Sequence, residues 1–389
     1  MFKIARQSVL VFIFVLGLAQ IAVAEDAPAP AAATPAAPAA DPAPSPKWYE
    51  TVAVGGMVDA YYSYNGNGFR GTGDNQYLGF AGDSNEFSVA LFELNFEKKP
   101  TTEHPAGFYV GLMEGTAAQI VDAVSDKSPF LGVLRQAYGS LLLAPYLQLD
   151  VGKYATLFGA EVIESNANWN YTRSILFSYA IPFTHTGARL TYTPNDMFYA
   201  QLHVVNGHNN VVNHTSGKGV GGQIGITPIK SLPIVLNYMA DSESAAANAA
   251  GPLPNIGSRS LFDAVVTFDA TASLSFRVNY DSGSQSNGSA TGGTATWTGV
   301  AGYARYALST PFLSAIALRY ESFNDADGFA TGIKQTLNEG TITLEKAVDS
   351  ALLRLDVRQD SSDQQVFTVS DGSTSKSQTT VTFGAVFTF

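Results

Sequence analysis

Strict alternation at the carboxy-terminal end of the sequence constrains the fold more than any other feature. Residues 379–389 read TTVTFGAVFTF. In an extended chain, one face carries the apolar side chains Val381, Phe383, Ala385, Phe387 and Phe389. The other face is polar or small, apart from Val386. Strands of this kind close outer-membrane β-barrels, where the apolar face meets lipid and aromatic side chains lie at the interface. We therefore predict such a barrel, with Phe389 as an assembly signal.

The amino-terminal region predicts export. A short basic segment precedes an apolar run at 9–21, and small residues ending at Ala24 follow it. The run is shorter than the roughly 20 residues of a membrane-spanning helix, so we expect a cleaved signal peptide over 1–24. The Ala/Pro-rich tract at 25–48 predicts a disordered periplasmic linker, because repeated proline removes backbone donors. The barrel is then expected over 49–389.

Composition supports a membrane-facing surface. Hydrophobic residues make up 46% of the chain and aromatic residues 12%, whereas charged residues make up only 14%, below the roughly 25% usual in soluble domains. Cysteine is absent, so disulfides and thiolate metal sites are excluded. The formal net charge of -11 argues against nucleic-acid binding, which needs a basic surface.

A repeating unit fills the rest of the chain: a strand, a tight turn, a second strand and a longer polar loop. We place the strand starts at Thr51, Asn85, Ala106, Val133, Tyr146, Phe183, Met197, Gly219, Leu232, Arg259, Ala272, Trp297, Phe312, Ile333, Ala351 and Ser377. The long loops are expected at 65–83, 116–132, 154–182, 207–218, 242–258, 282–296, 323–332 and 361–375. This predicts an all-β, antiparallel, up-and-down barrel of about 16 strands, with short periplasmic turns and long extracellular loops. Barrels of about 14 or 18 strands stay open as alternatives.

Clean alternation also assigns individual side chains to a face. Leu353, Leu355 and Val357 alternate with Arg354 and Arg358. A basic side chain that faces lipid costs about 2–4 kcal/mol at mid-membrane, so the apolar residues should face lipid and the arginines the lumen. The predicted lumen wall includes Glu93, Arg189, Arg277, Arg319, Arg354 and Arg358. We expect inward arginines on one wall and inward carboxylates on another, across an aqueous channel. An ion-paired, plugged interior is the alternative.

The loop at 154–182 is the longest and is rich in aromatic and amide side chains. We predict that it folds into the barrel and narrows it. Glu161, Glu164 and Arg173 would then line the constriction. The alternative is an ordinary packed outer loop.

The segment at 149–207, LDVGKYATLFGAEVIESNANWNYTRSILFSYAIPFTHTGARLTYTPNDMFYAQLHVVNG, resembles the signature region of the OmpL-like β-barrel porins. The shared elements are Gly152-Lys153, Gly159-Ala160-Glu161, Tyr171-Thr172-Arg173-Ser174, Pro182, Gly187 and Asn206-Gly207. The resemblance implies an outer-membrane barrel over 50–389 that acts as a porin. The Ala/Pro-rich tract lies outside it.

Catalysis and metal binding have little support. The chain has five histidines, and His203, His208 and His214 surround one loop. Their spacing matches no common metal motif, and no G-x-S-x-G elbow is present. We therefore expect no catalytic residues, no metal and no cofactor.

The sequence predicts a passive outer-membrane porin for small hydrophilic solutes and ions, filtered at a loop constriction. A substrate-specific channel for sugars or an anionic nutrient is the alternative, and a stacking path of aromatic side chains along the lumen would favour it. A plugged structural or adhesive barrel is a third reading. The expected partners are outer-membrane lipid, the diffusing solutes, the outer-membrane assembly machinery and periplasmic chaperones. A homotrimer stays open.

Overall fold

The computed structural model describes residues 51–68, 75–125, 132–213, 217–244 and 256–389. The predicted signal peptide at 1–24 and the predicted linker at 25–48 lie outside the described residues. Among the described residues, no helix has the length and apolar character needed to cross a membrane.

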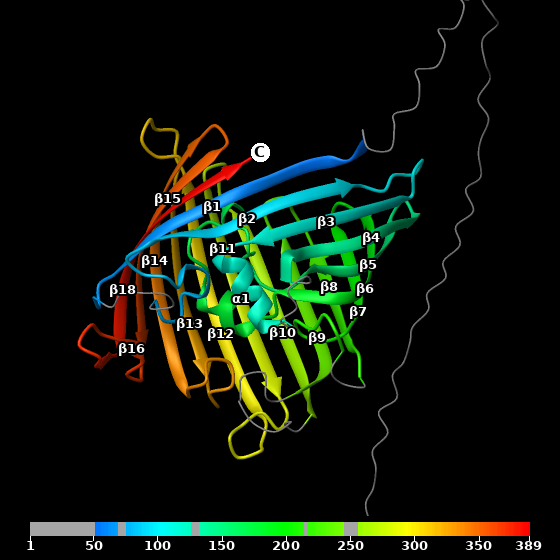
Figure 1. Ribbon diagram of the computed structural model, residues 1–389. Coiled ribbons are helices and arrows are strands. Elements are labelled where there is room, and N and C mark those ends of the chain that lie inside the picture. Colours follow the sequence, from blue (N-terminus) through cyan, green and yellow to red (C-terminus); the bar gives the residue numbers. More distant parts are fainter. Residues whose placement is uncertain (1–50, 69–74, 126–131, 214–216, 245–255) are drawn as a thin grey trace, which may run out of the picture. The chain divides into compact units, whose positions relative to one another are not determined.

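Sixteen strands of the described chain form one closed antiparallel barrel (Figure 1). They are β1 (Ala53–Asn65), β2 (Phe87–Lys98), β3 (Ala106–Glu114), β4 (Leu134–Ala144), β5 (Leu147–Ala155), β6 (Thr184–Asn195), β7 (Phe198–Val205), β8 (Gly219–Ile226), β9 (Ile234–Ser244), β10 (Ile256–Asp269), β11 (Leu274–Gln285), β12 (Ala295–Ala307), β13 (Ala315–Asp325), β14 (Gln335–Val348), β15 (Ala351–Ser362) and β18 (Ser377–Thr388). A separate hairpin pairs β16 (Phe367–Thr368) with β17 (Thr374–Ser375). The predicted architecture and strand number are confirmed. The largest offsets in strand starts are Phe312 against Ala315 and Arg259 against Ile256.

Sequence neighbours are also neighbours in the sheet, and β18 closes it by pairing with both β1 and β15. Phe389 continues this pairing beyond β18. Its backbone exchanges two hydrogen bonds with Gly56, of 3.0 and 3.1 Å. A Cβ at Gly56 would lie 2.6 Å from the Phe389 ring, so only glycine leaves room for the ring there. Phe389 therefore extends the closing ladder and also packs on β1.

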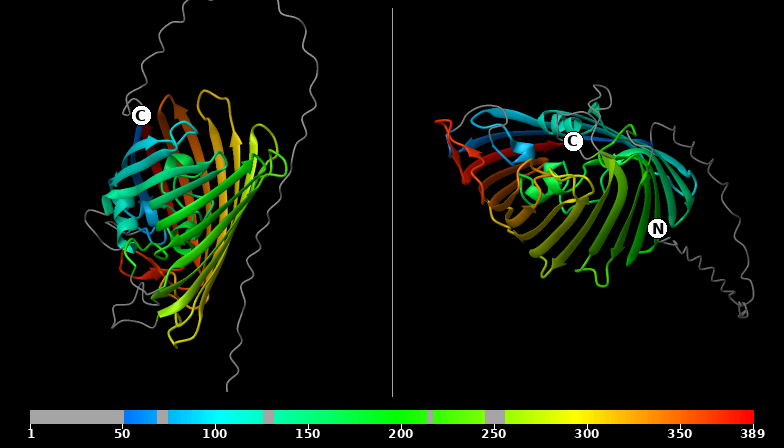
Figure 2. Two further views of the ribbon diagram at one scale, coloured as in Figure 1. Left: turned by 90° about the vertical axis from the view of Figure 1, so that its right-hand side faces the viewer. Right: turned by 90° about the horizontal axis from the view of Figure 1, so that it is seen from below.

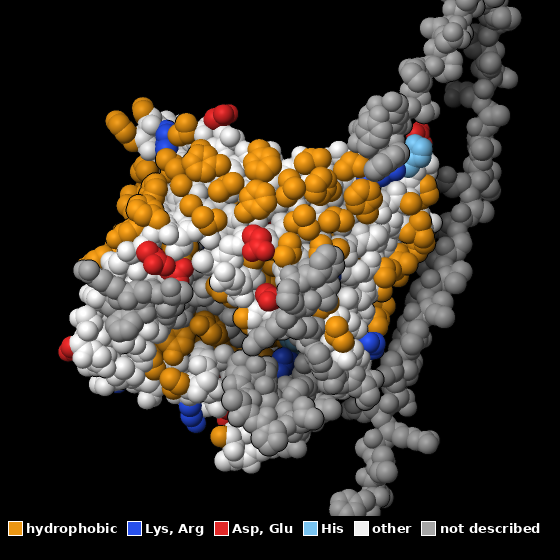
Figure 3. Space-filling view, viewed as in Figure 1, with side chains coloured by type: hydrophobic (Ala, Val, Ile, Leu, Met, Phe, Trp, Pro, Cys, Tyr) orange, Lys and Arg blue, Asp and Glu red, His pale blue; other side chains and the backbone are white. Residues whose placement is uncertain are grey.

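The strands separate an apolar outer face from a polar inner face, as alternation predicts. In β13, Leu318 and Tyr320 are 48% and 65% exposed, whereas Arg319 between them is 2% exposed. Val386, the exception in the last strand, is buried inside the barrel. Figure 3 shows apolar side chains spread across the strands of the face in view, with few charged side chains among them. Burial along the strands thus follows the alternation of the sequence.

Short and long connections alternate along the chain. Two residues, Asp349 and Ser350, link β14 to β15, and Asp349 has a φ of 52°, which aspartate tolerates in tight turns. The longest connection runs from 156 to 183, between β5 and β6. All short connections lie at one end of the barrel, here called the turn side, and the long ones lie at the other, the loop side (Figure 1).

The long loops contain ordered elements that the sequence did not predict. These are η2 (Gly79–Ala81), α1 (Thr116–Val124), η3 (Ser165–Ala167) and η4 (Leu176–Ala180). Seen from below in Figure 2, segments of the 156–183 loop lie inside the ring of strands. Phe80 of η2 packs there against Phe177 and Phe183, with ring centroids 5.5 and 5.3 Å apart. The loop-side half of the barrel thus holds an apolar core, because wall side chains alone cannot fill a barrel of this width.

The two faces should respond differently to the same added charge. Leu355→Arg places a guanidinium on the outer face of β15 and should destabilise the folded barrel by about 2–4 kcal/mol in lipid. Ser275→Arg, on the inner face of β11 near the turn side, should fold normally. The fraction of folded, heat-modifiable protein measures both effects. Equal defects in the two variants would contradict the face assignment.

Barrel closure predicts a second effect. Phe389→Asp removes the ring that packs on Gly56 and should lower the yield of folded, membrane-inserted protein. Phe389→Tyr keeps the ring and is the matched control. Protease protection of the barrel in isolated outer membranes gives the yield. Normal insertion of Phe389→Asp would show that Phe389 is dispensable for assembly.

Candidate functional site

The 156–183 loop is attached to the barrel wall on several sides. Four hydrogen bonds join it to β8, β11, β1 and β14: Gln223 Nε2 to Leu157 O (3.0 Å), Ala160 N to Asn279 Oδ1 (3.1 Å), Ser165 Oγ to Asp59 Oδ2 (2.6 Å) and Asn170 Nδ2 to Thr343 Oγ1 (2.8 Å). Since these strands lie on different sides of the closed sheet, the loop spans the lumen instead of lying along one wall.

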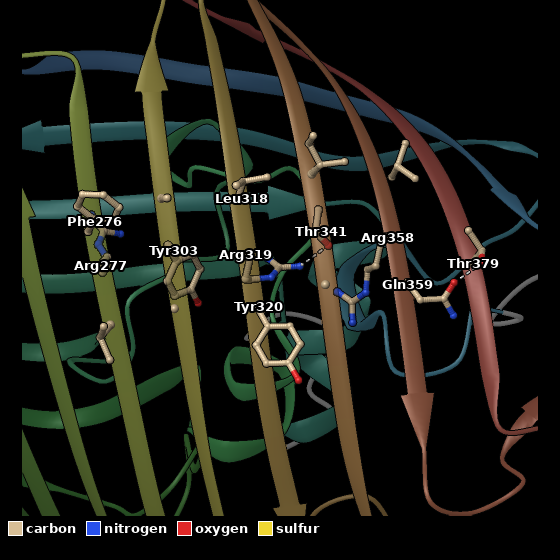
Figure 4. Close-up of a pocket in the computed structure, with 16 residues that line it drawn as sticks. Phe276, Arg277, Tyr303, Leu318, Arg319, Tyr320, Thr341, Arg358, Gln359 and Thr379 are labelled. Carbon is tan, nitrogen blue, oxygen red and sulfur yellow. Dashed lines mark hydrogen bonds between the residues drawn. The ribbon is translucent and has the colours of Figure 1, made fainter.

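Arg319 on β13 is the most heavily bonded contact between loop and wall. Its guanidinium lies 2.8 Å from Glu161 of the loop and 2.8 Å from Glu339 on β14. It also donates to the carbonyl oxygen of Thr172 at 2.5 Å. Figure 4 shows Arg319 reaching toward Thr341, a 3.4 Å hydrogen bond. One buried cation therefore joins two strands to two parts of the loop.

Two arginines of β15 bind the loop backbone. Arg354 donates to the carbonyl oxygens of Ser165 and Asn168 and pairs with Glu345 at 2.7 Å. Arg358 donates to the carbonyl oxygen of Arg173 at 2.7 Å and pairs with Asp360 at 2.7 Å. These wall arginines satisfy loop carbonyls that would otherwise be buried without partners.

The expected separation of basic and acidic walls is wrong. Arginines and carboxylates occupy the same or adjacent strands and pair there: Arg319 with Glu339, Arg354 with Glu345, Arg358 with Asp360 and Arg189 with Asp150. An inward charge loses much of its hydration beneath the loop, so it needs a partner close by. Alternation within a strand predicts which face a charge takes, but not which neighbour neutralises it.

The three loop residues predicted to line a constriction occupy packed positions. Arg173 is 1% exposed and donates to the carbonyl oxygens of Tyr171 and Ile163 within its own loop. Glu161 is 4% exposed beside Arg319. Glu164 accepts from Arg135 Nε at 3.0 Å. Burial alone would raise the pKa of Glu164, but the Arg135 guanidinium lowers it below its usual value.

The exposed side chains of the loop carry no charge. Val162 is 39% exposed, and Asn166 and Ala167 are also exposed. The loop's charges are therefore used inside the packing, and uncharged groups face the accessible space.

All six predicted wall residues lie on the inner face. Glu93 is buried on β2, near Arg135 of β4 and near Glu164 of the loop. Arg277 on β11 donates to Ala160 O at 2.8 Å and lies 4.5 Å from the centre of the Trp169 ring. Arg189 on β6 remains partly accessible toward the turn side. Arg319, Arg354 and Arg358 are the loop anchors described above.

Sequence reasoning missed the acidic anchors. Asp356 on β15 accepts hydrogen bonds from the backbone N–H and the hydroxyl of Thr172, at 2.8 and 2.9 Å. Glu321 on β13 accepts from the backbone N–H groups of Ile175 and Leu176, at 2.6 and 3.0 Å. Each carboxylate lies two residues from a predicted wall arginine, Arg354 or Arg319, and so shares its inner face. Their partners lie more than 140 residues away in sequence, where no local pattern reaches.

A cavity of about 750 Å³ lies on the outer face, outside the lumen (Figure 4). Its exposed lining is apolar, with Leu318, Tyr320 and Ile342 each at least 42% exposed. Gly302 and Gly340 are the register neighbours of Tyr320 on the adjacent strands and leave the hollow beside its ring. This surface suits contact with hydrocarbon and carries no reactive group.

The three buried histidines of the described residues, His185, His203 and His208, have conventional hydrogen-bond partners. His203 lies between the Tyr154 hydroxyl (3.2 Å) and the Gln201 amide oxygen (3.1 Å). His208 pairs with Asp241 at 2.5 Å. His214 lies outside the described residues. Within the described part of the chain, no three His, Cys, Asp or Glu side chains are grouped so that they could hold a metal ion.

The Arg319 cluster should contribute measurably to stability. Arg319→Met leaves the Glu161 carboxylate buried without its cation and leaves Glu339 only the more distant Arg358, 3.9 Å away. The change should cost about 3–5 kcal/mol of unfolding free energy. Arg305→Met is the matched control. Arg305 is 30% exposed, and its partner Glu345 still pairs with Arg354 when Arg305 is replaced. Urea unfolding in detergent or lipid gives both values. A cost below that of Arg305→Met would exclude Arg319 as the main anchor.

Comparisons with known proteins agree with this geometry. The family model described as "Putative beta-barrel porin-2, OmpL-like" matches residues 51–389. No curated protein matches the sequence.

Solved structures with the same fold include the anion-selective porin from Comamonas acidovorans, with 12% identity, a TM-score of 0.58 and coverage of 87% of this chain and 99% of that one. Salmonella typhi OmpF in complex with daunomycin has 13% identity, a TM-score of 0.55 and coverage of 87% and 97%. The trimer form of Vibrio cholerae OmpT has 9% identity, a TM-score of 0.51 and coverage of 87% and 99%. At these identities the likeness establishes the fold alone.

The family description points to a channel protein. Because the family model covers the whole barrel, the chain belongs to the OmpL-like family of β-barrel porins.

Proposed function

We propose that this chain is a passive diffusion porin for small hydrophilic solutes and ions, whose lumen is narrowed by the 156–183 loop. The attachment of this loop to β1, β8, β11 and β14 across the barrel interior supports the proposal above all. A loop held in this way reduces the open cross-section without any moving part or energy source.

The accessible inner surface lies toward the turn side. Gln148, Thr191, Gln201, Arg277 and Arg305 face the lumen there and are only partly buried. Toward the loop side, inner residues such as Asn279, Arg319 and Asp356 are buried beneath the loop. We propose a wide turn-side vestibule that leads to a narrow passage beside the loop.

The role of Glu161, Glu164 and Arg173 in this proposal differs from a simple charged lining. Their bonds suggest that they set the position of the constriction, while charge selectivity arises from the partly accessible Arg277. A fixed charge acts most strongly on an ion where water is scarce.

Orientation and export complete the proposal. We place the turn side in the periplasm and the loop side outside the cell, after removal of residues 1–24. Residues 25–48 would form a periplasmic linker, and Phe389 would be read by the assembly machinery after handover from periplasmic chaperones. A homotrimer is supported by the trimeric OmpT of similar fold.

One observation favours a second candidate, a plugged structural barrel. Leu78, Phe80, Phe177 and Phe183 form a dry core inside the loop-side half, each at most 3% exposed. Single-channel recording in planar bilayers separates the two candidates, because a plugged barrel conducts no salt.

Loosening the loop should widen the channel. Arg354→Ala removes two hydrogen bonds to the loop carbonyls of Ser165 and Asn168 and should raise single-channel conductance while the barrel stays folded. The control is Asp371→Asn in the exposed 363–376 loop. Hydrogen bonds from Ser373 lower the pKa of Asp371 and keep it ionised, but salt screens a charge at an open mouth. We expect no conductance change there. Equal conductance of Arg354→Ala and the unaltered protein would rule out this loop as the constriction.

A further inference from the structure

The inner wall of β3–β8 differs in chemistry from the loop-bearing wall of β11–β15. Its partly buried, lumen-facing side chains include three tyrosines and three amides: Tyr109, Tyr138 and Tyr199, with Gln136, Gln148 and Gln201. Neither the anchoring of the loop nor the closure of the barrel uses the three tyrosines. A wall of uncharged aromatic and amide groups beside a water-filled vestibule is chemically suited to a neutral polar solute.

The tyrosine rings lie against the wall because glycines make room for them. Tyr109 and Tyr138 are parallel within 7°, with ring centroids 5.6 Å apart. Tyr199 covers Gly225, where an added Cβ would lie 1.8 Å from the ring. A ring that lies on a glycine can turn its other face to the lumen. Between Tyr138 on β4 and Tyr199 on β7, Gly152 and Gly187 oppose each other on β5 and β6. These two positions therefore carry no side chain that could interrupt the wall.

The charges on this wall cancel. Arg189 lies 2.7 Å from Asp150, and the second oxygen of Asp150 accepts from Ser140 (2.7 Å) and Gln148 (2.8 Å). The guanidinium also lies 4.8 Å from the centre of the Tyr154 ring and 5.6 Å from the centre of the Tyr138 ring, so it covers Tyr138 and leaves Tyr109 and Tyr199 as the open rings of this wall. A cation held by a carboxylate and an aromatic face has little attraction left for a passing anion.

Uncharged hydrogen-bonding groups remain available along the same wall. Gln136 uses its amide oxygen to accept from Ala155 N at 2.8 Å, and Gln201 uses its amide oxygen on His203. Their NH₂ groups point to no acceptor among the described residues. Gln148 donates to Asp150 through its NH₂ group, and its amide oxygen accepts no hydrogen bond from the described residues. Donors and acceptors of this kind match hydroxyl groups, which both donate and accept.

We propose that the inner wall of β3–β8 is a binding track for neutral pyranose sugars. This inference rests on the proposed porin function. The C–H face of a pyranose packs on Tyr109 and on Tyr199, and its hydroxyl groups bond to Gln136, Gln148 and Gln201. Flexible polyols and polyethers lack a rigid apolar face and gain less from the same wall.

The test is block of salt current through the full-length protein in planar bilayers. The probe is maltotriose, and the reference is a poly(ethylene glycol) of equal hydrodynamic radius. Maltotriose should block at a lower half-saturating concentration than the reference. Tyr199→Ala should raise that concentration by about two- to tenfold, the range expected when one aromatic contact is lost. Tyr199→Phe keeps the ring and should stay close to the unaltered protein.

A matched control separates the track from a general effect of losing a tyrosine. Tyr238→Ala removes an outer-face ring that is 53% exposed on β9 and should leave the block unchanged. Tyr109→Ala gives an independent second variant if Tyr199→Ala fails to fold, and heat-modifiability reports folding in each case.

Three results would overturn the inference. Normal salt conductance with maltotriose no better than the reference would reject the sugar track and leave the porin function intact. Stronger block by an anionic trisaccharide than by maltotriose would show that the wall selects charge. Absence of any salt conductance would reject the porin function itself, and the track with it.

Discussion

The buried contact between Arg319 and Glu161 is the interaction on which the rest of the interior depends. A guanidinium without water is stable only if carboxylates and carbonyls surround it, and Arg319 finds Glu339 on the wall and Glu161 and Thr172 in the loop. The wall alone leaves this cation half-satisfied. The loop alone leaves Glu161 without a counter-charge. Each therefore fixes the other, and the lumen acquires a defined shape.

The same reasoning explains why so many anchors involve the loop backbone. Closure of the sheet removes all of its edges, so the wall offers side chains and no free ladder to a loop inside it. Backbone N–H and C=O groups that enter the lumen must find side-chain partners. Asp356 and Glu321 accept N–H groups, while Arg354 and Arg358 donate to carbonyls. One wall therefore carries both acidic residues, which accept from loop N–H groups, and basic residues, which donate to loop carbonyls.

The sequence predicted what depends on local periodicity. The segment from Leu318 to Tyr320 shows its outer and inner faces directly, because a charge in lipid is costly. It could not show that Arg319 would meet Glu161, 158 positions away, because alternation specifies a face and not a partner. Loop elements such as η4 also escaped prediction. They form because Phe177 finds Phe80 and Phe183 inside the barrel, a surrounding that exists only after closure.

Anchoring also decides where the free chemistry of the lumen lies. The sequence predicts that the arginines of β13 and β15 line the lumen. Their charge is, however, neutralised by Glu339, Asp360 and Glu345, and their hydrogen bonds are used on the loop. A passing solute therefore meets the groups that the loop leaves unoccupied. On β3–β8 these are tyrosine rings, amides and the compensated pair of Arg189 and Asp150. The formal net charge of -11 describes the whole chain, whereas selectivity in the proposed channel depends on this small set of accessible groups.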